Sequence, residues 1–278
     1  MITPEYLRPK LLQRENESHK GNYGHLLIVA GCQSMPGAAV LATGAALVSG
    51  CGLVTLHSTE RALQAVVNNF PSAMLSEDPG DFFSRVPALL ERYSAIAVGP
   101  GLGREAMTGE ALRKLMTAAK DIPMVLDADA LNLISERPEM MDLIPKGSVM
   151  TPHLGELRRL EPFDNGSEAA ENLAAKSGCV VVLKGYHSRI FAPDGTSLVN
   201  TTGNPGMAKG GSGDVLTGLV GGLLARGYSA LDAAALGVWI HGFAGDRLTE
   251  ARTAEAYSSR DLIDWIHTGF KELQSPGI

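Results

Sequence analysis

The sequence has few cysteines, few aromatic residues and no excess of positive charge. Cys32, Cys51 and Cys179 lie in apolar surroundings without CxxC spacing, which argues against a disulfide framework or a zinc site and indicates a reducing compartment. Aromatic residues make up only 5% of the chain, whereas glycine contributes 32 of its 278 residues, so we expect an aliphatic core with many tight turns. A net charge of -6 and a pI of about 5.7 disfavour nucleic acids and polybasic membrane binding.

Apolar segments suited to targeting or membrane insertion are also scarce. Residues 1–20 are charged throughout and lack the apolar block of a signal peptide. Residues 26–56 carry no charge, but glycine, proline and polar residues interrupt them, which predicts a buried strand, loop and helix in place of a membrane span. We therefore expect a cytoplasmic protein.

Short β-rich runs alternate with longer helical ones along most of the chain. Continuous apolar strands between helices predict a mostly parallel sheet covered on both faces, a three-layer α/β/α sandwich. No repeat or interdomain linker is evident, so we predict one domain over residues 1–278. The predicted strands are 25–30, 53–57, 94–99, 123–127, 148–151, 179–184, 188–192 and 197–200, and three helices are expected from residue 214 on.

The predicted strands end in loops rich in glycine, proline and polar residues. In parallel sheets, ligands bind beyond the carboxyl ends of the strands. The loops at those ends are GCQSMPG, GPGLG, DADALN, TPHLGE, KGYHS and NTTGNPGMAKGGSGD. The sequence thus predicts a site at this edge of the sheet before any chemistry is considered.

The last of these loops, Lys209 to Asp214, directly precedes an apolar helix. Consecutive glycines let successive N–H groups point into one concavity, and the helix adds its positive terminus. An acid beside a bound phosphate is repulsive unless it takes a proton from an attacking hydroxyl, so Asp214 is a candidate general base. The alternative is that Asp214 caps the helix over a flexible turn. The loop is not a Walker A motif, because GxxxxGK[ST] is absent.

Two acidic motifs leave alternatives open. Asp127 and Asp129 could hold Mg²⁺ through water, or Asp129 could simply cap a short helix. In TPHLGE, Thr151 is the expected N-cap with Pro152 at the first helical position. His153 and Glu156 are three residues apart and therefore share a helical face. Such a pair is more often solvated than functional.

The remaining motifs are individually weak. Lys184 and Gly185 follow a buried strand and suit a phosphate or ribose contact, unless they are a solvated strand end. His241 is interpreted as a core histidine without a role. GPGLG has the wrong glycine spacing for a dinucleotide fingerprint, and no GxSxG elbow indicates a serine nucleophile.

Taken together, six motifs resemble one family and stand in the order expected of it. They are KGNYGHLLIVAG with MPGAAVLA, VGPGLG, VLDADALN, TPHLGE, KG-x-x-S and NPGMAKGGSGDVLTG. The family is ADP-dependent NAD(P)H-hydrate dehydratase, of the ribokinase-like superfamily, and the resemblance runs from about residue 20 to the C-terminal helices. In this chain Lys209 stands where threonine or serine is common in the family.

The resemblance implies a repair reaction. The substrate would be NADH or NADPH hydrated at ring carbon 6, in the S form, which is dehydrated with conversion of ADP to AMP and phosphate. Asp214 would deprotonate the ring hydroxyl, and the N–H groups of Gly211, Ser212 and Gly213 would form an anion hole. Mg²⁺ would bridge the phosphates, with Asp127 or Glu156 as ligands through water. A homotetramer is also implied.

The resemblance further assigns binding residues. The nucleotide would contact Lys184, Gly185, Tyr186, His187, Ser188, Asn204, Lys209, Gly210 and Gly213, and the hydrated cofactor would contact Ala39, Gly101, Gly103, His153 and Asp214. Two rival interpretations are a ribokinase-like kinase for a vitamin precursor and a nonenzymatic nucleotide sensor. The full set of motifs disfavours the kinase, and an acid beside the phosphate loop disfavours the sensor.

Overall fold

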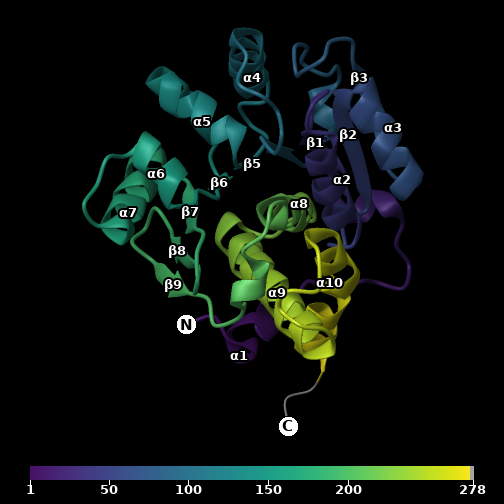
Figure 1. Cartoon of the computed structure of the whole chain (residues 1–278), viewed down its shortest axis with the longest axis vertical. Coiled ribbons are helices and arrows are strands. Elements are labelled where there is room, and N and C mark those ends of the chain that lie inside the picture. Colours follow the sequence, from purple (N-terminus) through teal and green to yellow (C-terminus); the bar gives the residue numbers. More distant parts are fainter. Residues whose placement is uncertain (276–278) are drawn as a thin grey trace.

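The computed structural model describes residues 1–275 and contains one nine-stranded sheet in the order β3-β2-β1-β4-β5-β6-β7-β8-β9 (Figure 1). Strands β1 to β7 pair in parallel, and β8 and β9 are added antiparallel at one edge. The strands are β1 His25–Val29, β2 Leu53–Thr59, β3 Met74–Asp78, β4 Ala95–Val98, β5 Met124–Leu126, β6 Val149–Met150, β7 Val180–Leu183, β8 Arg189–Phe191 and β9 Ser197–Val199.

Helices cover both faces of this sheet. The α-helices are α1 Pro4–Leu7, α2 Pro36–Leu47, α3 Glu60–Asn69, α4 Ala106–Ala118, α5 Asp129–Glu136, α6 Leu154–Leu160, α7 Gly166–Ser177, α8 Ser212–Ala225, α9 Ala230–Ala251 and α10 Ser259–Gln274. Short 3-10 turns are η1 Arg8–Lys10, η2 Lys20–Tyr23, η3 Leu90–Arg92, η4 Pro138–Leu143 and η5 Pro205–Met207. Helices α4 to α7 pack on one face, and α2, α3 and α8 to α10 pack on the other (Figure 1).

The core follows from the alternation of side chains along buried strands. In β1, Leu26 and Ile28 join the cluster under α2 and α8, whereas Leu27 and Val29 join the cluster under α4 and α5. Helix α8 approaches α2 very closely, since a side chain on Gly218 would come within 1.9 Å of the Ala42 carbonyl oxygen. This close approach fixes the first turn of α8 beside the carboxyl ends of the strands.

The three-layer architecture predicted from the sequence is confirmed, as are the eight predicted strands and the three C-terminal helices. The sequence did not predict β3 or helices α1, α3 and α7. Over residues 1–275, no helix is both long and apolar enough to cross a membrane. The predicted domain extends to residue 278, and its last three residues lie outside the described range.

Candidate active site

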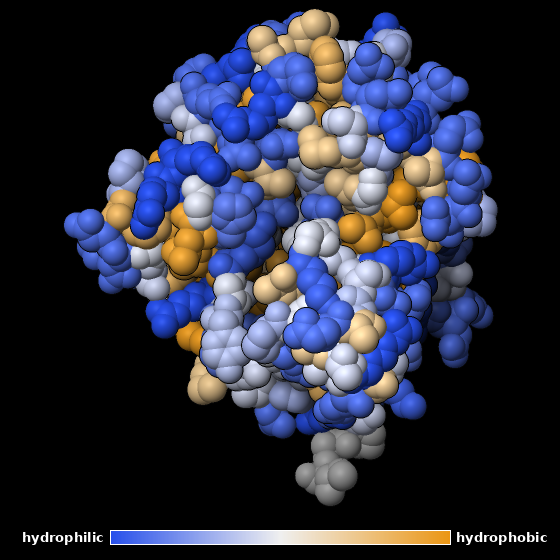
Figure 2. Space-filling model, viewed as in Figure 1, coloured by the Kyte–Doolittle hydropathy of each residue, from blue (hydrophilic) through white to orange (hydrophobic). Residues whose placement is uncertain are grey.

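A cavity of about 560 Å³ lies at the carboxyl ends of β5, β6 and β7, facing the first turn of α8. The space-filling view is hollowed near the middle of the same face, where Figure 1 places α8 (Figure 2). The predicted site residues that line the cavity are Asp127, His153, Glu156, Lys184, Gly185, Tyr186, His187, Ser188, Asn204, Ser212, Gly213 and Asp214. The loop motifs singled out in the sequence therefore meet largely as expected.

The glycine-rich loop starts α8 through a left-handed residue. Gly211 is the N-cap with φ +91°, and a side chain there would also come within 2.3 Å of Leu41. The Ser212 N–H donates to the Lys209 carbonyl at 3.3 Å, whereas no hydrogen bond in residues 1–275 engages the N–H groups of Gly213 and Asp214. Open amides at a helix N-terminus bind anions readily.

Asp214 lies in the first turn of α8 and lines the cavity. Because Gly211 occupies the capping position, the alternative that Asp214 is the N-cap is wrong. Within the described residues its carboxylate has no hydrogen-bond or ion-pair partner. Burial, followed by the nearby charge of Asp127, raises the pKa of Asp214 to about 6, although Lys184 opposes the shift. The carboxylate is therefore suited to accept a proton near neutral pH.

Asp127, directly after β5, has hydrogen-bond partners on both carboxylate oxygens, unlike Asp214. Its Oδ1 accepts a hydrogen bond from Lys184 Nζ at 2.5 Å, and its Oδ2 accepts one from the Thr217 hydroxyl at 2.7 Å. Lys184 Nζ also lies 3.6 Å from Glu156 Oε2. Burial alone would lower the pKa of Lys184, but Asp127 and Glu156 outweigh it and the pKa is raised. The ammonium is thus held charged at the cavity floor.

His153 and Glu156 form the N-terminus of α6 together. The expectation that Thr151 caps this helix is wrong, because α6 begins at Leu154 with His153 as N-cap. His153 Nδ1 accepts from the N–H of Gly155 at 2.9 Å and of Glu156 at 3.1 Å, and Glu156 Oε2 accepts from the His153 N–H at 2.8 Å. This reciprocal capping turns both side chains toward the strand end, beside Lys184.

The arrangement of carboxylates bears on the predicted metal ligands. Both oxygens of Asp127 are occupied, and Glu156 is engaged in capping. Asp129 points away, since its Oδ2 accepts from the N–H of Gly103 at 2.9 Å and so stabilises the GPGLG loop. Residues 1–275 contain no cluster of three or more potential metal ligands. Direct coordination by Asp127 or Glu156 is not favoured, and contact through water stays a prediction.

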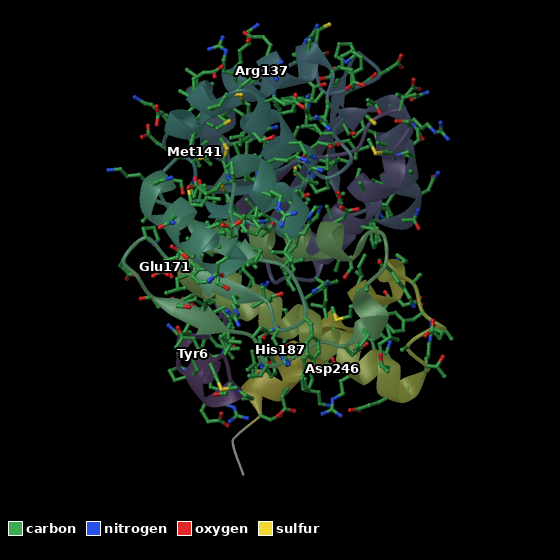
Figure 3. The ribbon with its side chains drawn as sticks, turned by 60° about the vertical axis from the view of Figure 1, so that its left-hand side comes forward. Tyr6, Arg137, Met141, Glu171, His187 and Asp246 are labelled. Atoms are coloured by element: carbon green, nitrogen blue, oxygen red, sulfur yellow. The ribbon has the colours of Figure 1, made fainter. Side chains whose placement is uncertain are left out.

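Residues 184–188 form one wall of the cavity, in the connection between β7 and β8. His187 adopts a left-handed conformation with φ +55°, and its Nδ1 lies 3.2 Å from the Asn200 carbonyl oxygen. The Tyr186 ring is 76% exposed and lies 3.9 Å from the His187 ring, between centroids. Figure 3 labels His187 on this connection and Asp246 on α9.

Six predicted residues do not line this cavity. Ala39 has no exposed surface, and Gly103 is buried, so neither offers surface to a ligand in this conformation. The Lys209 ammonium donates to the carbonyl oxygens of Ala254, Glu255 and Tyr257, and a contact of Lys209 with the nucleotide stays a prediction. Gly101, Gly210 and Gly211 are also outside the lining.

His241, which the sequence led us to interpret as a core histidine, is a cavity residue. His241 lines the cavity from α9, and its Nε2 lies 3.4 Å from the Ser212 hydroxyl. Burial lowers the pKa of His241 to about 4, so the imidazole is neutral. In the sequence, His241 stands in an apolar helix, and nothing there distinguishes a cavity histidine from a core one.

Asp246, also on α9, does not line the cavity but supports its wall, a role that the sequence did not predict. Its carboxylate accepts from the Gly203 N–H and the Asn204 amide, each at 2.9 Å. Asn204 Oδ1 in turn accepts from the N–H of Gly206 at 3.0 Å. The Asn204 side chain therefore shapes the loop that walls the cavity.

Comparison with solved structures defines the class. A ribokinase-like superfamily protein from Enterococcus faecalis matches with a TM-score of 0.87 at 29% identity, covering 99% of this chain and 96% of that one. The fold and the glycine-led helix at the strand-end cavity thus define a ribokinase-like α/β protein.

Comparison of sequences defines the family, since the model of NAD(P)H-hydrate dehydratase matches residues 26–268. The chain belongs to the NAD(P)H-hydrate dehydratase family. It is 35% identical to the ADP-dependent (S)-NAD(P)H-hydrate dehydratase of Bacillus subtilis, over 98% of both chains. A structure of the ADP/ATP-dependent enzyme from B. subtilis, co-crystallized with ATP/Mg²⁺, has a TM-score of 0.87 at 33% identity over 98% of each chain.

The family also contains longer proteins. The chain is 37% identical to the bifunctional NAD(P)H-hydrate repair enzyme of Moorella thermoacetica over 99% of its own length. It spans 54% of that relative, about half of the bifunctional enzyme.

Proposed function

We propose that the protein catalyses the ADP-dependent dehydration of the S form of hydrated NADH or NADPH, regenerating the reduced cofactor with release of AMP and phosphate. Family membership and the shared architecture support this assignment. The observation that carries the chemistry is the carboxylate of Asp214, which lines the cavity beside open amides and has a pKa raised to about 6.

The role proposed for Asp214 is that of general base. Hydroxide is a poor leaving group, since water has a pKa of about 15.7, whereas phosphate has a second pKa of about 6. Asp214 would take the proton of the hydroxyl on ring carbon 6, and that oxygen would attack the terminal phosphorus of ADP. The bond from this phosphorus to the bridging oxygen breaks, and AMP leaves.

The second stage restores the ring. The lone pair of the ring nitrogen expels the phosphate by breaking the carbon–oxygen bond, and loss of a proton from the adjacent carbon re-forms the double bond. The amides of Gly213 and Asp214, together with the Lys184 ammonium, are placed to stabilise the charge on the transferring group. A side chain added to Gly213 would lie 3.4 Å from Lys184 Nζ, so amide and ammonium are close together.

The predicted nucleotide residues 184–188 would hold the AMP portion along the cavity wall. Because Asp127 and Glu156 already have partners, Mg²⁺ would bind mainly through the nucleotide phosphates and neutralise part of their charge. The hydrated cofactor would approach Asp214 from the side of α2, which carries Ala39, and of the loop that carries Gly101 and Gly103. A cytoplasmic location and a homotetramer remain predictions.

A product assay tests the proposal. The protein is incubated with S-hydrated NADH, ADP and Mg²⁺, while dihydropyridine absorbance, AMP and phosphate are measured. Recovery of NADH with equal amounts of AMP and phosphate is expected. Formation of a stable phosphorylated product without NADH would instead indicate the rival kinase, and binding without turnover would indicate a sensor.

A further inference from the structure

Lys209 immediately precedes the glycines that start α8, and its ammonium is surrounded by backbone carbonyl groups. Its Nζ donates to the carbonyl oxygens of Tyr257 at 2.6 Å, Ala254 at 2.8 Å and Glu255 at 3.3 Å. These carbonyls belong to the connection between α9 and α10. An ammonium has three N–H donors, so each can meet one of the three carbonyls.

The Lys209 ammonium is held by neutral groups and not by a carboxylate. Within the described residues Lys209 forms no ion pair, and besides the carbonyls its Nζ lies 4.1 Å from the centroid of the Tyr257 ring. Converging carbonyl oxygens replace the hydration shell of monovalent cations such as K⁺, and an aromatic face adds further attraction. Lys209 therefore occupies a carbonyl cage of the kind that a free monovalent cation could fill.

We propose that the Lys209 ammonium is a tethered monovalent cation that positions the glycine-rich loop and makes a free cation unnecessary. Lys209 is a positioning residue, and its effect on turnover rests on the proposed role of residues 210–214 in phosphate transfer. In the family that the sequence resembles, threonine or serine is common at this position. Neither side chain carries the charge needed to fill the cage.

The contacts around the cage explain how it fixes the loop. The Ser212 N–H donates to the Lys209 carbonyl at 3.3 Å, and the Ser259 hydroxyl donates to the Gly210 carbonyl at 2.8 Å. The first bond closes the turn on itself, the second ties it to the start of α10, and the Lys209 ammonium ties it to the connection before α10. The amides of Gly213 and Asp214 are left without hydrogen-bond partners among residues 1–275. Lys209 is not among the groups that shift the pKa of Asp214, so it acts through position.

Replacing Lys209 removes the ammonium from the carbonyl cage, and a free monovalent cation can then be added to test whether it takes the same place. Lys209→Met keeps an unbranched apolar side chain but removes the ammonium. In an assay buffer that contains Mg²⁺ and choline as its only monovalent cation, we expect kcat/KM for ADP to fall about tenfold or more. Adding K⁺ or NH₄⁺ should restore it saturably, while the wild-type protein should respond to neither. Lys209→Gln, which retains neutral donors, should lose less activity and show little rescue.

Thermal unfolding supplies a readout that does not depend on turnover. K⁺ should raise the melting temperature of Lys209→Met but leave that of the wild-type protein unchanged. Lys176→Met is the matched control, because Lys176 binds the Glu161 carboxylate on the surface at 2.6 Å and has no carbonyl cage. It should show no cation dependence in either assay.

Several outcomes overturn the proposal. They are a K⁺ requirement of the wild-type protein, full activity of Lys209→Met in choline, a loss that no monovalent cation relieves, and failure of the variant to fold even with K⁺. If the wild-type protein lacked ADP-dependent turnover, the proposed function would fail. The K⁺-dependent melting temperature of Lys209→Met would still test the cage.

Discussion

Two carboxylates at the same end of the sheet have opposite surroundings. Asp127, at the end of β5, is bonded on both oxygens by Lys184 and Thr217. Asp214, in the first turn of α8, has no such partner within residues 1–275, and burial raises its pKa to about 6. One acid has hydrogen bonds on both oxygens, and the other is left without partners and able to exchange a proton near neutral pH. The difference supports the proposal that Asp214 performs chemistry while Asp127 organises the site.

Asp214→Asn should have the largest effect of the variants that test this difference between Asp127 and Asp214. The amide keeps the shape of the side chain but cannot take a proton from the substrate hydroxyl. We expect turnover to fall by about 10²–10⁴-fold, the usual contribution of a general base. Nucleotide affinity, measured by calorimetry, should change little. Turnover within a few fold of the wild-type rate would remove Asp214 as the base.

The pH dependence of kcat/KM measures the same difference. Because only ionised Asp214 can act as a base, kcat/KM should fall about tenfold per pH unit below pH about 6 and level off above it. In Asp127→Asn this limb should move to lower pH, since the charge of Asp127 helps to raise the pKa of Asp214. An unmoved limb would show that the two acids are not electrostatically coupled.

The sequence was sufficient to predict which residues gather at this site, but it could not predict which hydrogen-bond partners they have. GGSGD and the strand-end loops could be located, because glycine content and apolar runs are local properties of the chain. The direction of Lys209 depends on carbonyls some 45 residues later, which no local pattern reveals. Threonine is a common N-cap, but Thr151 is fully buried directly after β6, and His153 takes that position.

Burial decided the other differences. Ala39 was assigned to the substrate by resemblance, yet it lies without exposed surface beneath Gly31, where a side chain would come within 2.9 Å of it. β3 was omitted because its residues are mostly exposed at the sheet edge, so its sequence lacks the apolar run of a central strand. Such features depend on which elements become neighbours in the fold.

The unpaired acid should also reduce stability. A folded-state pKa of about 6, above the ordinary 3.8, means that the folded protein binds the Asp214 proton more tightly than the unfolded chain does. Stability is therefore lost as pH rises from about 4 to 6, and the full cost is present above that range. Asp214→Asn should be more stable than the wild-type protein by about 1–3 kcal/mol at pH 8 and nearly equal at pH 4. Denaturant unfolding at both pH values checks this, and an equal difference at both would contradict it.

The smallest expected effect concerns the hydroxyl that completes the pairing of Asp127. Thr217→Val removes the 2.7 Å hydrogen bond to Asp127 Oδ2 at a fully buried position while keeping the branched shape. A buried carboxylate oxygen without its donor should reduce unfolding free energy by about 1–3 kcal/mol. Lys184 still binds the other oxygen, so the acid limb of kcat/KM, which we assign to Asp214, should stay where it is. Thr217→Ser, which retains the hydroxyl, is the matched control. If the limb shifted in Thr217→Val alone, the hydrogen bonds of Asp127 would also control the proton of Asp214, and the division between an organising acid and a proton acceptor would not hold.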